Sequence, residues 1–98
     1  MIPDLTMKEI FCKAIQNKQR VEFIYHEKIR VGEPQCCGIS KTGKEVVRMH
    51  LIKGGSRPEQ LFEIAQIKDL KTIDEYFEKP GPNYRRNDSA MSEIFCQL

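Results

Sequence analysis

Residues 20–34 alternate apolar and polar side chains in the pattern that most constrains how this chain can fold. The segment reads RVEFIYHEKIRVGEP. Three apolar side chains of its first half share one face of an extended chain, since successive side chains of a strand point to opposite sides. The polar step at 26–28 predicts a turn, and the alternation resumes at Ile29. We therefore predict an antiparallel hairpin whose second strand ends at Pro34, because proline has no amide to give to a central ladder.

A helix is predicted upstream, from Met7 to Asn17. Thr6 and Glu9 have the spacing of a capping box, with Leu5 and Ile10 as a hydrophobic staple around it. The apolar residues that follow recur at i, i+3, i+4, i+7 and i+8, which places them on one face of a helix. A small sheet needs a cover for its open side, so we expect this face to be core rather than a partner-binding surface.

Three further strands are predicted, over Glu45–Lys53, Gln60–Ile67 and Lys68–Phe77. A glycine turn at 41–44 precedes the first of them. That strand has two different faces, of which one is expected to be core and the other is partly basic. The first face holds Val47, Met49 and Leu51, and the second holds Val46, Arg48, His50 and Ile52.

The sequence Pro80-Gly81-Pro82 interrupts regular structure, so we predict one domain over 1–79 and a tail over 80–98. The apolar residues of the tail have helical spacing, which favours a terminal helix docked on the domain or an arm placed on a neighbouring subunit. An exposed tail this apolar would be a liability, and we favour burial against its own chain. These residues are Met91, Ile94, Phe95 and Leu98.

Composition sets the size and setting of the protein. A chain of 98 residues, 40% hydrophobic and 31% charged, fits one small domain with one core. The formal net charge of +2 is too small to indicate a nucleic-acid binder by itself. No signal peptide and no membrane-spanning run is recognisable, so we expect a soluble cytoplasmic protein.

The chain has four cysteines, Cys12, Cys36, Cys37 and Cys96. Without a secretory signal we expect reduced thiols, with Cys12 and Cys96 packed as small apolar groups. A metal site made of the two adjacent cysteines with His26 and His50 is the alternative. Adjacent cysteines lack the CxxC spacing of a zinc knuckle, so we predict no metal ligand and no cofactor.

One helix followed by five short strands predicts a mainly β (α+β) fold. In this fold the helix packs on a small five-stranded antiparallel, partly open barrel of the Src-homology-3 or Sm type. Over residues 10–77 the chain also resembles the bacterial WYL domain. The resemblance rests on Ala14-Ile15, Val21–Tyr25, Arg30–Pro34, the turn at Gly43, and Phe62–Ile67 followed by Phe77.

The resemblance implies an Sm-like barrel that senses a ligand in transcription regulators, in some members a nucleotide or nucleic acid, and that contributes to dimerisation. Arg30 matches the family's arginine before the glutamate-proline step. Val46 and Val47 stand in place of the signature aromatic residues, and Gln60 and Gln66 stand where the family has arginines. Those arginines are associated with anionic ligands, so the ligand class stays open. No helix-turn-helix precedes the domain, and the chain resembles a stand-alone member.

A basic rim is the candidate binding site. We expect its cations to converge from neighbouring strands and the following loop, with Tyr25 or Tyr84 available to stack on a base. Guanidinium groups suit phosphate because they present several donors in a planar fork. The alternative is a solvated surface balanced by glutamates. The predicted cations are Arg30, Arg48, His50, Lys53 and Arg57.

Three functions follow from these observations. The first is a non-enzymatic ligand-sensing or nucleic-acid-binding regulatory module. The second is a protein-interaction module that dimerises or docks on a partner through edge strands and the tail. An enzyme is the weakest, because no nucleophile elbow, metal-binding helix or paired carboxylates can be recognised.

Overall fold

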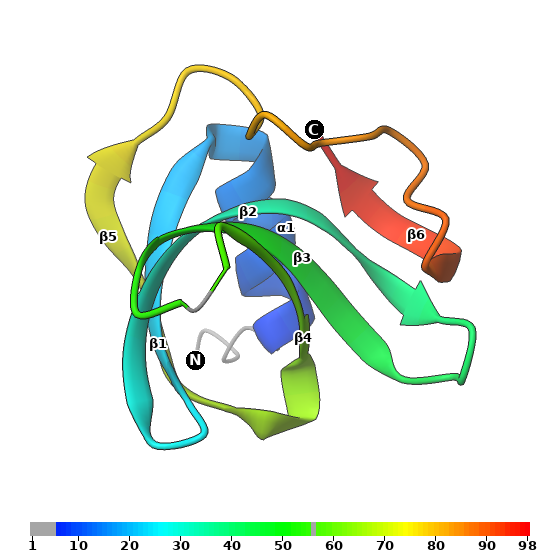
Figure 1. The fold of residues 1–98 in the computed structure, drawn as a ribbon, viewed down its shortest axis with the longest axis horizontal. Coiled ribbons are helices and arrows are strands. Elements are labelled where there is room, and N and C mark those ends of the chain that lie inside the picture. Colours follow the sequence, from blue (N-terminus) through cyan, green and yellow to red (C-terminus); the bar gives the residue numbers. More distant parts are fainter. Residues whose placement is uncertain (1–5, 56) are drawn as a thin grey trace, which may run out of the picture.

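A computed structural model describes residues 6–55 and 57–98 of the chain. Within them one α-helix is followed by six strands and a single turn of 3₁₀-helix (Figure 1). In chain order the elements are α1 (Met7–Asn17), β1 (Gln19–Tyr25), β2 (Lys28–Ser40), β3 (Glu45–Lys53), β4 (Glu59–Glu63), η1 (Ile64–Gln66), β5 (Ile67–Tyr76) and β6 (Met91–Gln97).

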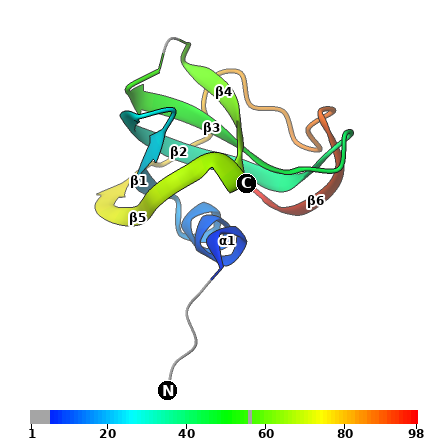
Figure 2. The ribbon, with the colours of Figure 1, turned by 90° about the horizontal axis from the view of Figure 1, so that it is seen from below.

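Helix α1 has the predicted bounds and the predicted cap. The Thr6 hydroxyl oxygen accepts from the Glu9 amide at 3.2 Å, and Lys18 ends the helix in the left-handed conformation, with φ of 52°. Leu5, the predicted staple residue, lies outside the described residues. The apolar face packs against one side of the curved sheet (Figure 2), as expected for a core-facing stripe. Its buried members are Phe11, Ala14 and Ile15.

The strands form one six-stranded antiparallel sheet in the order β4-β3-β2-β1-β5, with β6 paired to β2 beside this path. Strands β4 and β5 stand at opposite ends of that order, although the three residues of η1 are all that separates them. The sheet must therefore curl to bring its two ends together (Figure 1). No ladder joins β4 to β5 within the described part of the chain, so the sheet is not closed and the predicted barrel is not confirmed.

Strand β2 continues six residues past Pro34, where the sequence predicted its end. Its first part pairs with β1 as far as Gly32, and its last part pairs with β6 from Cys36 onward. Pro34 lies in the gap between these two partners, next to a bulge on the β3 side. The missing amide of proline is tolerated there, because neither β1 nor β6 pairs with this position.

The C-terminal segment forms strand β6, and the predicted terminal helix is wrong. The register of β6 on β2 shifts twice, once at Ser92 and once at Phe95. Each extra residue changes which side the following side chains face. As a result Phe95 and Cys96 both pack against the main core, and the apolar spacing differs from the period of two that a regular strand shows. The apolar residues of the tail pack against their own chain, as favoured from the sequence.

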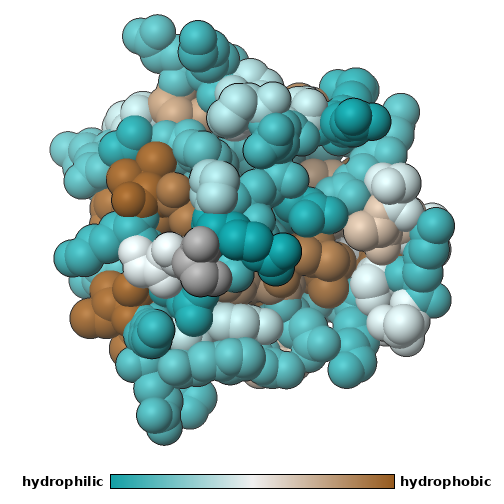
Figure 3. All heavy atoms as spheres, in the orientation of Figure 1, coloured by the Kyte–Doolittle hydropathy of each residue, from teal (hydrophilic) through white to brown (hydrophobic). Residues whose placement is uncertain are grey.

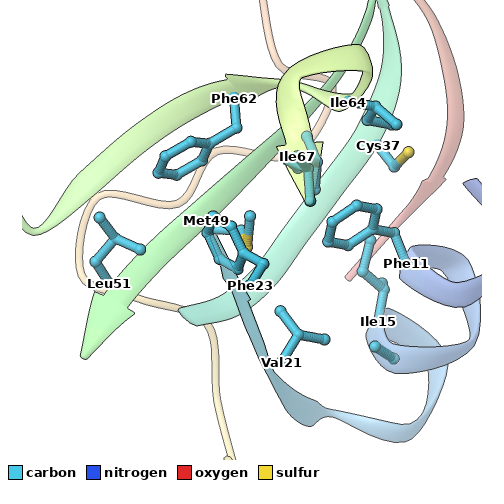
Figure 4. Packing of buried hydrophobic residues seen from close by; sticks show 12 residues of the cluster. Phe11, Ile15, Val21, Phe23, Cys37, Met49, Leu51, Phe62, Ile64 and Ile67 are labelled. Carbon is cyan, nitrogen blue, oxygen red and sulfur yellow. The ribbon is translucent and has the colours of Figure 1, made fainter. Parts of the chain in front are cut away.

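The core lies between α1 and the sheet, as Figure 4 shows for its labelled side chains. The predicted inner face of β3 is confirmed, since Val47, Met49 and Leu51 are all buried there. Phe23 and Phe62 meet edge to face, with ring centroids 5.2 Å apart. A second, smaller cluster lies on the other face of the sheet. Its members are Cys36, Val46 and Met91, with Leu61 and Ile94 packed against them.

A disulfide joins Cys12 of α1 to Cys96 of β6, across 84 residues of sequence. The prediction that these two cysteines are reduced thiols is therefore wrong. The proximity of the two cysteines depends on the pairing of β6 with β2, which no local pattern in the sequence indicates. The bond fastens the last strand to the first helix.

Candidate functional site

Arg30 lies at one end of the main core, just after the turn between β1 and β2. Its side chain spans the aromatic rings of Tyr25 and Phe62, with the guanidinium carbon 5.4 and 5.6 Å from their centroids. One terminal nitrogen donates to the Tyr25 carbonyl oxygen at 3.2 Å, and the other donates to the Gln60 side-chain oxygen at 3.4 Å. A guanidinium over aromatic faces is attracted by their quadrupoles.

The charge of Arg30 has no carboxylate partner among the described residues. Arg20 and Arg48, in contrast, are each paired with glutamate or aspartate. The Nε–H of Arg30 is buried without any hydrogen-bond acceptor, which costs about 1–3 kcal/mol for a buried donor. Arg30 is thus a half-buried cation whose charge and donors are incompletely satisfied.

Tyr25 holds Arg30 in place rather than presenting a free ring. His26 stacks on it with centroids 4.3 Å apart, and Phe62 meets it edge to face at 4.8 Å. The Tyr25 hydroxyl oxygen accepts from the Glu63 amide at 3.3 Å. The exposed ring at this position is that of His26, so the predicted stacking residue Tyr25 is covered on one face. No local pattern indicated Phe62 as a platform for Arg30, because the position of Phe62 at the end of the core depends on the pairing of β4 with β3.

Lys53 and Arg57 lie on the same side of the molecule as Arg30. Both are exposed and line a hollow of about 230 Å³ around the loop that follows β3. Gly54 of this loop packs directly on Arg30, because a Cβ added to it would stand 3.1 Å from the Arg30 Cγ. Figure 3 shows hydrophobic surface on both sides of this pale glycine loop. Three of the predicted cations therefore share one region.

Arg48 and His50 lie elsewhere, on the outer face of the sheet. The chain between β5 and β6 crosses this face, on the side opposite α1 (Figure 2). Asp88 of this segment accepts from Arg48 Nε at 2.8 Å and from Nη2 at 3.3 Å, and Glu59 stands 3.9 Å away. The His50 ring lies against Gly81. The six predicted residues thus form two groups, and the charge of Arg48 is already neutralised.

The Arg48–Asp88 pair predicts a dependence of stability on acid. Burial raises the pKa of Asp88, but hydrogen bonds from Arg48 and from the Ala90 amide outweigh it, and the pKa falls below its ordinary value of 3.8. Because the pKa of Asp88 is lower in the folded chain than in the unfolded chain, the ionised carboxylate stabilises the fold at pH values above the ordinary pKa. This stability is lost as the pH falls through the lowered pKa of the folded chain. We expect Asp88→Asn to reduce the loss of urea resistance below about pH 4. An unchanged pH profile in the variant would contradict this.

The fold does not bring together the alternative metal site considered from the sequence, which combined Cys36 and Cys37 with the two histidines. His26 lies at the β1–β2 turn, where its Nε2 stands 2.6 Å from the Gln66 side-chain oxygen. Cys36 and Cys37 belong to clusters on opposite faces of the sheet, and burial raises their pKa values to about 11 and about 12. Cys37 lies instead beside the Cys12–Cys96 disulfide, with the three sulfur atoms within 4.8 Å of one another.

The fold and the site define a small, open antiparallel β domain, covered by one helix, that carries a half-buried arginine with no carboxylate partner in residues 6–55 and 57–98. Comparisons with family profiles, curated proteins and solved structures gave no match for this chain. Among the described helical residues, no segment has the length and apolar character needed to cross a bilayer.

Proposed function

We propose that the chain is a non-enzymatic regulatory module of the WYL type that binds an anionic ligand, a nucleotide or single-stranded nucleic acid, at Arg30. The observation that carries this proposal is the guanidinium of Arg30, which is held on two aromatic rings and pairs with no carboxylate in the part of the chain that the structure describes. A phosphate supplies the anionic partner that the guanidinium lacks among the described residues, because its oxygens accept from the exposed protons of the terminal nitrogens. Charge-assisted hydrogen bonds of this kind are about twice as strong as neutral ones.

Lys53 and Arg57 extend this site along the loop after β3. In the proposed complex Arg30 binds one phosphate with its fork, and the two exposed cations attract further phosphates through charge alone. Gln60 occupies the place of a family arginine and orients Arg30 through its side-chain oxygen. A neutral residue there favours a ligand with fewer phosphates near the fork.

Arg30→Gln is expected to weaken binding of short single-stranded DNA, RNA or a labelled nucleotide by about tenfold or more, because a charged hydrogen bond contributes about 1.5–3 kcal/mol. The measurement is fluorescence anisotropy across a salt series. The slope of log affinity against log salt should fall by about one unit for each phosphate contact removed. The variant should keep its circular dichroism spectrum, because it loses two long hydrogen bonds but also removes a buried Nε–H that has no acceptor among the described residues.

Arg85→Gln is the matched control, because it removes the same charge from an exposed position on the outer face near Asp88. This variant should bind like the unmodified chain. Equal loss in both variants would mean that binding follows net charge rather than Arg30. No binding by the unmodified chain at low salt would overturn the proposal.

A protein-interaction module is the second candidate. Ile29 and Ile52 are 55% and 46% exposed beside the loop after β3, and Tyr76 is 58% exposed on β5. Large apolar side chains at the surface are typical of contact sites when they cluster. A dimer that persists at high salt in analytical ultracentrifugation, and that Ile29→Lys disrupts, would favour this function over anion binding.

A further inference from the structure

Three cysteines from distant parts of the chain meet on the helix side of the sheet. Cys37 and Cys96 are direct partners in the β2–β6 ladder, and Cys12 reaches both from α1. Their sulfur atoms all lie within 4.8 Å of one another. Cys37 is fully buried, whereas the other two are partly exposed. Disulfide formation uses two of these sulfurs and leaves the third as an adjacent thiol.

We propose that reduction of the Cys12–Cys96 disulfide creates a three-thiolate site, made of Cys12, Cys37 and Cys96, for a thiophilic d¹⁰ cation such as Zn²⁺. A dithiol or phosphine reductant supplies the two electrons that break the S–S bond, and two protons convert its sulfurs to thiols. The cation then forms three metal–sulfur bonds and displaces one proton from each thiol.

The sulfur positions suit one shared ion. With Zn–S bonds of about 2.3 Å, sulfurs around a single zinc ion lie about 3.8–4.0 Å apart. The three sulfur atoms lie within 4.8 Å of one another, so the largest separation exceeds this spacing by about 1 Å at most, and the bonded pair must move apart after reduction. Cys37 and Cys96 are fixed by the ladder and Cys12 by the helix, so the ligands are positioned before the metal enters.

An open hollow on the surface gives the ion access and room for a fourth ligand. The hollow has a volume of about 460 Å³ and is lined by Cys12, Cys96, Glu9 and Lys13. Glu9 precedes Cys12 by three residues, which places both on one helix face. Its carboxylate or a water molecule completes a tetrahedral site. Lys8 and Lys13 lie on the same helix and offset the negative charge of three thiolates.

This site does not depend on the proposed function. It lies between α1 and β6, whereas Arg30 lies at the β1–β2 turn, so either proposal can fail alone.

The experiment is a titration of the reduced full chain with Co²⁺, a spectroscopic substitute for Zn²⁺, in a phosphine reductant. We expect sulfur-to-cobalt charge-transfer absorption that saturates at one ion per chain and disappears when Zn²⁺ is added. The oxidised chain should show no such band. Cys37→Ser should weaken binding by at least about tenfold, as expected when one of three thiolates is lost.

Cys36→Ser is the matched control, because Cys36 is equally buried but belongs to the cluster on the other face. It should bind cobalt like the unmodified chain. If reduction unfolds the chain by circular dichroism, Zn²⁺ should restore the folded spectrum. The proposal is overturned by a missing charge-transfer band, by equal binding in the Cys36 and Cys37 variants, by equal binding in the oxidised chain, or by a reduced, unfolded chain that Zn²⁺ does not refold.

Discussion

Phe23→Ala should lower the free energy of unfolding by about 3–5 kcal/mol, as expected when a buried phenylalanine is removed from a packed core. Phe23 is 0% exposed and lies among Val21, Met49 and Phe62, with its ring edge to face on the last of these. A domain of this size has about 5–15 kcal/mol of total stability. The melting temperature should therefore fall by roughly 12 °C or more.

The control is Ile29→Ala, because the Ile29 side chain is apolar but 55% exposed. Ile29 lies on β2, the strand that pairs with β1. Exposed substitutions usually change stability by less than about 0.5 kcal/mol. Thermal unfolding followed by circular dichroism compares the two variants. Similar melting temperatures for both would mean that Phe23 does not face the core, and that the faces of β1 are reversed.

Local patterns were enough to predict α1 and β3, with their bounds. The cap of α1 depends on Thr6 and Glu9, three residues apart, and the two faces of β3 follow from simple alternation. Both features depend on near neighbours in the sequence, so the sequence specifies them directly. The hairpin of β1 and β2 was predicted for the same reason.

Features that depend on distant pairing were not predictable from these patterns. Pro34 indicated a strand end, but β2 changes partner there, and only the whole sheet reveals this. The bulges at Ser92 and Phe95 interrupt the period-two alternation of β6, so its apolar residues have the spacing of a helix. Strand β4 ends at Glu63 because η1 begins there, which divides the strand predicted over Gln60–Ile67.

The candidate site was predicted only in part, for the same physical reason. The sequence predicted that Arg30, Lys53 and Arg57 lie near one another, because they belong to expected neighbouring strands and the loop that follows. Whether a cation is free depends on carboxylates from elsewhere in the chain. Asp88 pairs with Arg48 across 40 residues, in a segment that the sequence assigned to a tail. No local pattern shows which arginine will be neutralised in this way.

Loss of the Cys12–Cys96 disulfide should lower the free energy of unfolding by roughly 4.5 kcal/mol, the value that the chain-entropy model gives for a closed loop of this length. The bond closes a loop of 84 residues, most of the chain. Strand β6 pairs with β2 alone and is the element that the disulfide holds to α1. The double variant Cys12→Ala and Cys96→Ala should therefore unfold at a lower urea concentration, and the amides of β6 should exchange with solvent first.

Three matched conditions separate the covalent bond from the cysteines themselves. A phosphine reductant should lower the urea midpoint of the unmodified chain toward that of the double variant. The urea midpoint of the double variant should not change. Cys36→Ala should keep the shift on reduction, because Cys36 belongs to the cluster on the opposite face. A chelator is needed throughout, since a cation bound to the folded state would stabilise the reduced chain by mass action. Coincident midpoints for the oxidised and reduced chains under chelation would mean that β6 is held by its ladder with β2 and by packing alone, and that the disulfide adds nothing to the stability of the fold.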